Sequence, residues 1–164
     1  QTLSPEIPVV SLRLSNLYGP GQNLTKLQGI ISHLALAAIT RNPVNIFVPL
    51  DTLRDFIYAD EAALRSLHWV AHARTWSQSA TRVVGSGRPQ TLGRVISVFK
   101  SVSKTQVPVS FGFDPSSKLQ ARNLTFVPDS DTTLSLMGVT PLPVGVKQTY
   151  LDLTLRHAES CLER

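Results

Sequence analysis

Short apolar runs alternate with longer segments of helical periodicity along this chain, and that alternation restricts its fold more than any other feature. Residues 8–15 form a buried, strand-like run, and the apolar residues between Lys26 and Arg41 recur at the spacing of one helix face. Further strand-like runs are 44–48, 56–58, 82–84, 108–111 and 124–127, and further helical segments are 60–74, 91–102 and 144–162. Strands that alternate with helices predict an α/β domain.

Polar residues at the starts of three helical segments suit a capping role. Asp60, Thr91 and Asp129 each carry a side-chain oxygen that can accept a hydrogen bond from an unpaired N–H group of the first helical turn. For the segment that begins at Asp60, helical spacing predicts an inner face made of Ala63, Leu67, Val70 and Ala71.

Length and composition fit a single folded region over residues 1–164, since 42% of the residues are hydrophobic. No run approaches the roughly 20 apolar residues that span a bilayer, so we expect no membrane partner. Cys161 is the only cysteine, which excludes an internal disulfide and favours a cytoplasmic setting.

The net charge of +5 is unevenly distributed. No acidic residue occurs between Glu61 and Asp114, whereas the basic residues there are Arg65, Arg74, Arg82, Arg88, Arg94, Lys100 and Lys104. A field of one sign attracts nucleic acid, a nucleotide cofactor or a nucleotide-linked substrate, although such residues commonly form solvated helix faces. Nucleic acid is the least favoured partner, because the chain has no recognised nucleic-acid motif.

One candidate ligand-binding side chain, Asn16, comes directly after a strand-like run, where open α/β sheets bind their ligands. The amide of Asn16 suits a phosphate or a sugar hydroxyl, but an Asn beside a Gly-Pro turn equally often closes the turn. The guanidinium of Arg54 suits a phosphate, with an ion pair to Asp51 or Asp55 as the alternative. Phe47 is a candidate for stacking on a base or for the core.

Two segments, Arg13-Leu14-Ser15-Asn16-Leu17-Tyr18-Gly19-Pro20-Gly21 and Arg54-Asp55-Phe56-Ile57-Tyr58-Ala59-Asp60, closely resemble the extended short-chain dehydrogenase/reductases. These are the NAD-dependent epimerase/dehydratase proteins, such as UDP-glucose 4-epimerases. Later signatures occur in the family's order: Arg82-Val83-Val84-Gly85-Ser86-Gly87 with Thr91-Leu92, and then Met137-Gly138-Val139-Thr140-Pro141. The resemblance implies the C-terminal portion of a Rossmann-type enzyme, with two strands of its sheet (8–15 and 82–84) and the small mixed substrate-binding domain.

Carried over residue by residue, the resemblance implies a substrate cradle. Asn16 and Arg54 match residues that hold the nucleotide diphosphate, and Arg122 or Lys118 matches a further phosphate-binding position. Asn45 and Phe47 match the strand that lies along the base. Leu14 and Ser15 match positions beside the nicotinamide of NAD or NADP.

Two signatures of the family do not occur in these 164 residues. The dinucleotide fingerprint G-x-x-G-x-x-G is absent, and so is the catalytic pair Y-x-x-x-K, because Tyr18, Tyr58 and Tyr150 are followed four residues later by Gln22, Ala62 and Thr154. We therefore expect no catalytic residue in the chain, and whether it acts as an enzyme stays open. The leading hypothesis is the substrate-binding part of an NAD(P)-dependent nucleotide-sugar epimerase/dehydratase. It would need an N-terminal dinucleotide-binding half or another copy as partner. The alternative is a non-catalytic module that binds a nucleotide sugar or a partner.

Metal binding is not expected from the sequence. His68 and His72 share a helix face at i, i+4 spacing, which suits a metal, but Trp69 stands where H-E-x-x-H would have Glu, and no third ligand is expected nearby. His157 and Cys161 have the same spacing close to the C-terminus.

Overall fold

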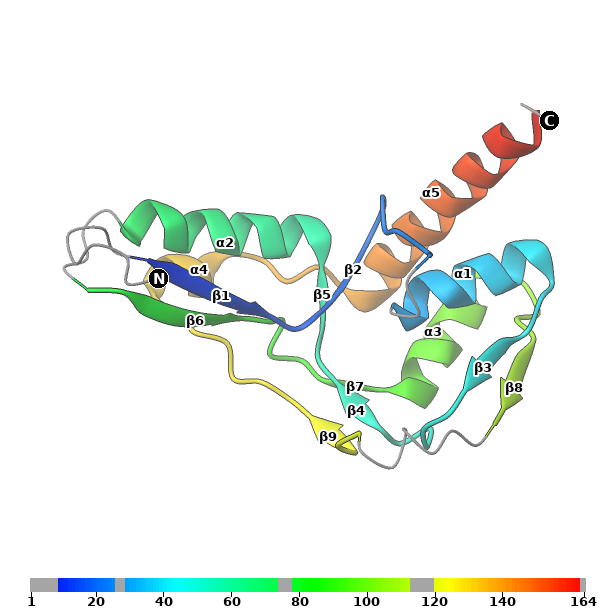
Figure 1. Ribbon diagram of the computed structural model, residues 1–164, viewed down its shortest axis with the longest axis horizontal. Coiled ribbons are helices and arrows are strands. Elements are labelled where there is room, and N and C mark those ends of the chain that lie inside the picture. Colours follow the sequence, from blue (N-terminus) through cyan, green and yellow to red (C-terminus); the bar gives the residue numbers. More distant parts are fainter. Residues whose placement is uncertain (1–8, 26–28, 74–77, 113–119, 163–164) are drawn as a thin grey trace.

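The computed structural model describes residues 9–25, 29–73, 78–112 and 120–162 (Figure 1). At one end of the molecule, β1 (Val10–Leu14) pairs in parallel with β6 (Ala80–Val84). The helix α2 (Ala59–Ala73) packs on both strands, and the short helix α4 (Thr132–Leu136) lies next to them. The two strands expected to belong to one parallel sheet therefore do lie side by side.

The middle of the molecule is a second parallel pair, formed by β2 (Asn16–Tyr18) and β5 (Phe56–Tyr58). Asn16 was expected just past the end of the first strand-like run, with closure of a turn as the alternative role. It does follow β1, and it begins β2 opposite Phe56 in the ladder, so the turn-closing alternative is wrong. The strand β5 leads directly into α2, so the motif that starts at Arg54 runs from the centre of the molecule to its first end.

The other end of the molecule is built from three helices: α1 (Ile30–Thr40), α3 (Leu92–Ser103) and α5 (Leu142–Leu162). Beside them β3 (Val44–Ile46) pairs in parallel with β8 (Val109–Phe111). A three-stranded sheet lies below, in which β4 (Leu53–Arg54) pairs antiparallel with β7 (Gln90–Thr91) and parallel with β9 (Asn123–Leu124). Among the described helices, none has the length and apolar character of a membrane span.

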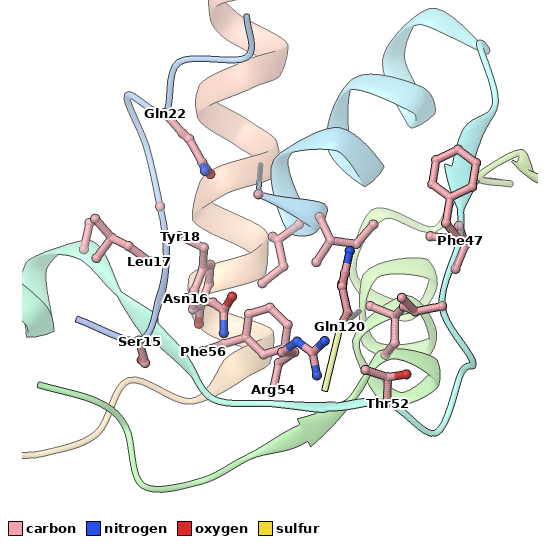
Figure 2. Close-up of a pocket in the computed structure, with 18 of the residues that line it drawn as sticks. Ser15, Asn16, Leu17, Tyr18, Gln22, Phe47, Thr52, Arg54, Phe56 and Gln120 are labelled. Atoms are coloured by element: carbon pink, nitrogen blue, oxygen red, sulfur yellow. The ribbon is translucent and has the colours of Figure 1, made fainter. Parts of the chain in front are cut away.

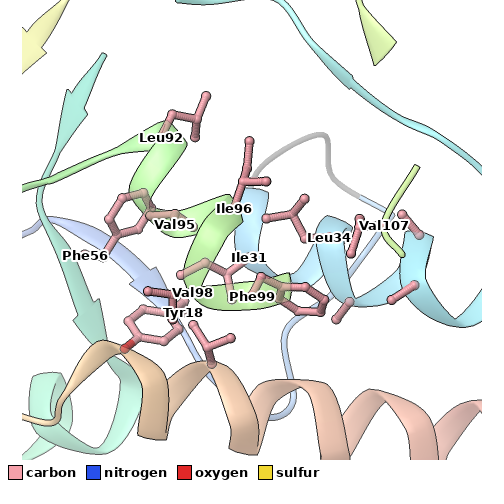
Figure 3. Close-up of a cluster of buried hydrophobic side chains, with 14 of the residues drawn as sticks. Tyr18, Ile31, Leu34, Phe56, Leu92, Val95, Ile96, Val98, Phe99 and Val107 are labelled. Atoms are coloured by element: carbon pink, nitrogen blue, oxygen red, sulfur yellow. The ribbon is translucent and has the colours of Figure 1, made fainter. Parts of the chain in front are cut away.

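Buried apolar side chains form two separate clusters. The larger lies between α1, α3 and α5 and includes Ile31, Leu34, Val95, Phe99 and Val146 (Figure 3). The smaller lies between the β1–β6 pair, α2 and α4, and it contains Ile57, Trp69, Val84 and Leu134. Tyr18 and Phe56 belong to the larger cluster, so the central strands β2 and β5 contribute to its packing.

The helix α2 buries the face opposite to the one predicted. Trp69, Ala62 and Ala73 point inward together with Glu61, Arg65 and His68. The predicted inner residues Ala63, Leu67, Val70 and Ala71 are exposed. The prediction failed because both faces carry apolar residues, and because the polar residues of the buried face satisfy one another. Arg65 donates to Glu61 at 3.0 Å, and the second Glu61 oxygen accepts from the Thr140 N–H at 3.0 Å.

Of the predicted helix caps, only that of α3 is confirmed. The Thr91 hydroxyl oxygen accepts from the Arg94 N–H at 3.1 Å. Asp60 is not a cap, because α2 already begins at Ala59. The cap of α4 is Asp131, whose Oδ1 accepts from the Leu134 N–H at 2.8 Å. The Asp129 carboxylate instead accepts from the Val83 N–H at 2.6 Å, next to the β1–β6 pair.

The helix predicted from Lys26 begins at Ile30 in the structure, and residues 26–28 lie outside the described part of the chain. Gly29 precedes the helix with φ +95°, a conformation that favours glycine. The short strands β2, β4 and β7 were not predicted, whereas the other helices and strands match predicted segments apart from shifts of a few residues at their ends.

Candidate functional site

A cleft of about 830 Å³ lies where β2, β3, β4 and the start of α1 meet (Figure 2). Five of the seven residues proposed from the sequence line it: Ser15, Asn16, Asn45, Phe47 and Arg54. They come from segments up to 39 residues apart in sequence, and the fold brings them to one opening. The other two, Leu14 and Arg122, do not line the cleft.

Arg54 is a half-buried cation at the floor of the cleft, held by backbone oxygens. Its Nη1 donates to the carbonyl of Leu53 at 2.8 Å and to the carbonyl of Arg122 at 3.3 Å. Within the part of the chain that the structure describes, no carboxylate forms an ion pair with Arg54. The two ion-pair alternatives, Asp51 and Asp55, both have other partners. The guanidinium therefore retains donor groups that suit an anionic ligand.

Asn16 is fixed by the same motif that carries Arg54. Its side-chain amide donates to the Asp55 carbonyl at 2.7 Å, and its backbone N–H donates to that oxygen at 3.0 Å. The amide group has a second N–H, and its oxygen is an acceptor, so the contact leaves hydrogen-bonding capacity at the cleft. The Asn16 side chain thus hydrogen-bonds to the backbone of the neighbouring strand segment and also lines the cleft.

Asn45 and Phe47 lie at another part of the cleft, along and just after β3. The Asn45 Oδ1 accepts a hydrogen bond from the Ser110 hydroxyl across the β3–β8 ladder. Phe47 is 41% exposed, so it is not the core residue that was the alternative in the sequence analysis. Its ring lies against Gly112, where an added Cβ would be 2.9 Å from a ring carbon. The ring face is available for an apolar or aromatic ligand group.

The end of β1 presents two neighbouring residues in different environments. Leu14 is 47% exposed and stands opposite Val84 in the β1–β6 ladder. The Ser15 hydroxyl is buried and lacks a hydrogen-bond partner among the described residues. A buried polar atom without a partner is uncommon, and a ligand is one way to satisfy it.

Arg122 lies outside the cleft, on the exposed side of the small sheet. Its guanidinium forms an ion pair with Asp51, and both side chains are more than half exposed. Its backbone carbonyl, in contrast, accepts hydrogen bonds from Leu53 and Arg54. The contribution of this residue to the described site is therefore through its backbone, and phosphate binding by its side chain stays a prediction.

Several lining residues were not found from the sequence, including Thr52, Gln120, Gln22 and Tyr18. Thr52 is almost completely buried, and its hydroxyl has no partner in the described segments. Thr52 and Gln120 lie in irregular loops, where no periodicity indicates which way a side chain points. Thr52 stands two residues before Arg54, and that proximity is the only sequence signal that would have suggested it.

Tyr18 and Tyr58 are the tyrosines closest to this region, and neither suits a proton acceptor. Burial raises the pKa of the Tyr18 phenol well above its usual value, and the nearby Glu61 and Tyr58 raise it further. The pKa of Tyr58 is also raised, by burial and then by Asp60 and Asp152. Both phenols stay protonated near neutral pH, so they can donate hydrogen bonds but do not act as bases there.

The expectation that no third ligand accompanies His68 and His72 is wrong. Asp131, 59 residues after His72, lies next to them at the start of α4. Sequence spacing within one helix had no means of showing a ligand from another element.

Comparison with known proteins adds the identity of the fold and of its family. The model of the NAD dependent epimerase/dehydratase family matches residues 2–85. A curated relative, the dTDP-4-dehydro-6-deoxyglucose reductase of Escherichia coli, is 28% identical over 105 residues, which are 62% of this chain and 31% of the relative.

Solved structures match over nearly the whole chain. The structure of MoeE5 in complex with UDP-glucose and NAD has 25% identity and a TM-score of 0.72, and the match covers 93% of this chain and 48% of that one. The UDP-glucuronic acid 4-epimerase of Bacillus cereus has 18% identity and a TM-score of 0.75, with 92% and 46% covered.

This chain thus spans about half the length of the solved structures that it matches. The match to the family model covers just over half of the chain. It includes β1, β2, α2, β6 and the segment Arg54-Asp55-Phe56, called the RDF motif below. The fold agrees with this match, since its mixed α/β arrangement is that of Rossmann-type epimerases. The chain belongs to the NAD dependent epimerase/dehydratase family.

Proposed function

We propose that this chain forms the nucleotide-sugar-binding part of an NAD(P)-dependent epimerase, dehydratase or reductase. The observation that carries the proposal is the cleft lined by Asn16, Phe47 and Arg54. Among the described residues, no carboxylate forms an ion pair with Arg54. A nucleotide sugar needs a cation for its diphosphate, an apolar surface for its base and polar groups for its hydroxyls. The cleft offers all three.

Within this proposal, Arg54 and Asn16 bind the diphosphate and Phe47 packs on the base. Arg54 is restrained by two backbone carbonyls, so little side-chain freedom is lost when a phosphate binds. Asn45 and Gln120 line the cleft with Phe47 and supply polar groups for the edge of the base or the ribose. The relative MoeE5, which was solved with UDP-glucose, supports this substrate class.

NAD or NADP is the cofactor proposed for the complete protein, and it supplies a hydride acceptor or donor when bound. Leu14 and Ser15 fit a position along the edge of its nicotinamide ring. Leu14 offers an exposed apolar surface, and the buried Ser15 hydroxyl lacks a partner among the described residues and can bind an amide. Solved relatives contain NAD or NADPH, which supports the assignment.

The outer face of α2 is proposed to contact the dinucleotide-binding half of the family fold. Leu64, Leu67 and Val70 on this face are 59%, 64% and 53% exposed. A helix that is apolar on opposite faces is normally covered on both. The strand β1 pairs with β6 on one edge, and no strand of the described ranges pairs with its other edge. Another strand can therefore add to the β1–β6 pair at the same end of the molecule. The relatives' additional length supports this partner over a second copy.

Calorimetric titration with UDP-glucose and dTDP-glucose tests the substrate-binding proposal. Replacement of Arg54 by Ala should weaken binding of either ligand by roughly tenfold to a hundredfold, because a charge-assisted hydrogen bond is lost. Arg156→Ala is the matched control, since Arg156 pairs with Asp152 on α5 and does not line the cleft. Equal affinity of the parent and Arg54→Ala would exclude Arg54 as a phosphate ligand.

The polypeptide encoded upstream of Gln1 tests the assignment to a larger enzyme. A glycine-rich strand-turn-helix and Y-x-x-x-K are expected there, and without them the non-catalytic binding module is the better description.

Light scattering on the isolated chain adds a second measurement. The exposed apolar face of α2 predicts that the chain self-associates and that Leu67→Lys reduces the association. A monomeric chain with one cooperative unfolding transition would contradict the proposal that this face is normally covered by a partner.

A further inference from the structure

Three side chains of metal-binding type gather beside the β1–β6 pair, away from the cleft. His68 and His72 lie one turn apart on α2, and Asp131 caps the start of α4. The helices α2 and α4 both lie beside the β1–β6 pair (Figure 1). One donor atom from each residue lies within 4.8 Å of the corresponding atoms of the other two. The two imidazole rings are 4.1 Å apart at their centres. None of the three residues lines the cleft described above.

We propose that His68, His72 and Asp131 bind a divalent transition-metal ion, with zinc as the best match. Two imidazoles and one carboxylate are typical zinc ligands, and a fourth position stays open to water in a site of this kind. Because His72 is exposed and Asp131 is partly exposed, the ion can reach the cluster from solvent. This site is independent of the proposed nucleotide-sugar cleft.

Each ligand is oriented by a second contact, as in established metal sites. The Asp131 Oδ1 caps α4 through the Leu134 N–H, and this bond directs Oδ2 toward His68. The Nδ1 of His72 lies 2.8 Å from the His68 carbonyl oxygen, so donation to that carbonyl places the ring's lone pair on Nε2. His68 is buried and packs against Trp69 in an edge-to-face arrangement, with the centres of the two rings 5.2 Å apart. The side chains are therefore held in place before the ion binds.

A bound ion would lie between His68 and Asp131 and replace their direct contact. The His68 Nε2 and the Asp131 Oδ2 are 2.5 Å apart. Two donors bound to one tetrahedral zinc at about 2.0–2.2 Å from the metal lie about 3.3 Å apart, so the two atoms must separate slightly. Because zinc binds neutral imidazole and ionised carboxylate, its affinity is expected to fall as the pH is lowered.

Calorimetric titration of the 164-residue chain with zinc chloride tests the proposal. The background variant Cys161→Ser removes the thiol next to His157, the other metal-binding pair on the described helices. In that background one zinc ion is expected to bind per chain. His72→Ala, at an exposed position, is expected to lower the affinity by roughly tenfold to a hundredfold or more.

Two further variants separate metal binding from folding. Asp131→Asn keeps an N-cap side chain for α4 but loses the charged ligand, so it should also weaken zinc binding without unfolding the helix. His157→Ala should leave the affinity unchanged. Zinc should raise the thermal unfolding midpoint of the background variant and not that of His72→Ala. Equal zinc affinity in the background variant and His72→Ala, or a loss of binding in His157→Ala alone, would overturn the site.

Discussion

The carboxylate of Asp55 accepts two hydrogen bonds from Ser86, one from its backbone N–H at 2.9 Å and one from its hydroxyl at 3.1 Å. Asp55 is completely buried, and its own backbone carbonyl holds both the amide side chain and the N–H of Asn16. One residue therefore links the RDF motif to the turn after β6 and to the first residue of β2. The cleft-lining residues Asn16 and Arg54 depend on this link for their relative positions.

Replacement of Asp55 by Ala is expected to lower the free energy of unfolding by about 3 kcal/mol, because two donors of Ser86 lose a charged acceptor in a buried site. Ser86→Ala removes only the hydroxyl bond and should cost about half as much. Urea denaturation measures both. The control is Asp60→Asn, an exposed residue whose change should stay within about 0.5 kcal/mol. An Asp55→Ala variant as stable as Asp60→Asn would contradict the linking role.

The packing of α5 against β2 predicts a strong effect at Gly145. A Cβ added there would lie 2.5 Å from the Tyr18 hydroxyl and 2.9 Å from two ring carbons. We expect Gly145→Ala to destabilise the chain by about 1–3 kcal/mol, the usual range for overpacking. Gly138→Ala is the matched control, since nothing lies within 4 Å of its added Cβ. Thermal unfolding of both variants decides the prediction, which fails if their midpoints coincide.

Tyr18 should make the stability of the chain sensitive to alkaline pH. Because the pKa of Tyr18 is raised in the folded state, the unfolded chain loses this proton first as the pH rises. Its contribution is complete below about pH 10, the pKa of an unfolded tyrosine, and declines above that value. Tyr18→Phe is expected to flatten the fall in unfolding free energy above pH 10, measured by urea denaturation at several pH values. Parallel curves for the two proteins would contradict the assignment.

The predictable part of this fold came from segments in which local pattern and tertiary contact agree. The runs that became β1 and β6 are apolar and bounded by turns, and Thr91 caps a helix whose apolar residues all face one way. The inner face of α2 was predicted wrongly because its sequence is apolar on opposite sides. Tertiary contacts decide which side is buried, among them the ion pair of Arg65 with Glu61 and the contact of Glu61 with Thr140.

The candidate site divides in the same way. Asn16 and Phe47 were found from their places at the ends of strand-like runs, and Arg54 from the chemistry of its guanidinium, in each case together with the family resemblance. Thr52 and Gln120 come from loops without periodicity, and Asp131 approaches His68 only through the packing of α4 beside α2. Contacts between elements far apart in sequence have no local signal, so the structure was needed to find them.

Phe47 gives the sharpest test of how the cleft recognises a base. If the ring stacks on the base, Phe47→Ala should weaken binding of UDP-glucose by about 1–3 kcal/mol, which is roughly fivefold to 150-fold, and should leave the weaker binding of glucose 1-phosphate unchanged. Phe111→Ala is the control, because Phe111 is 66% exposed on the neighbouring strand β8 but does not line the cleft. Calorimetric titration of both ligands separates the base from the phosphate. An equal loss of affinity for UDP-glucose and glucose 1-phosphate would contradict stacking and mean that Phe47 shapes the cleft as a whole. Stacking on a base affects only the ligand that carries a base.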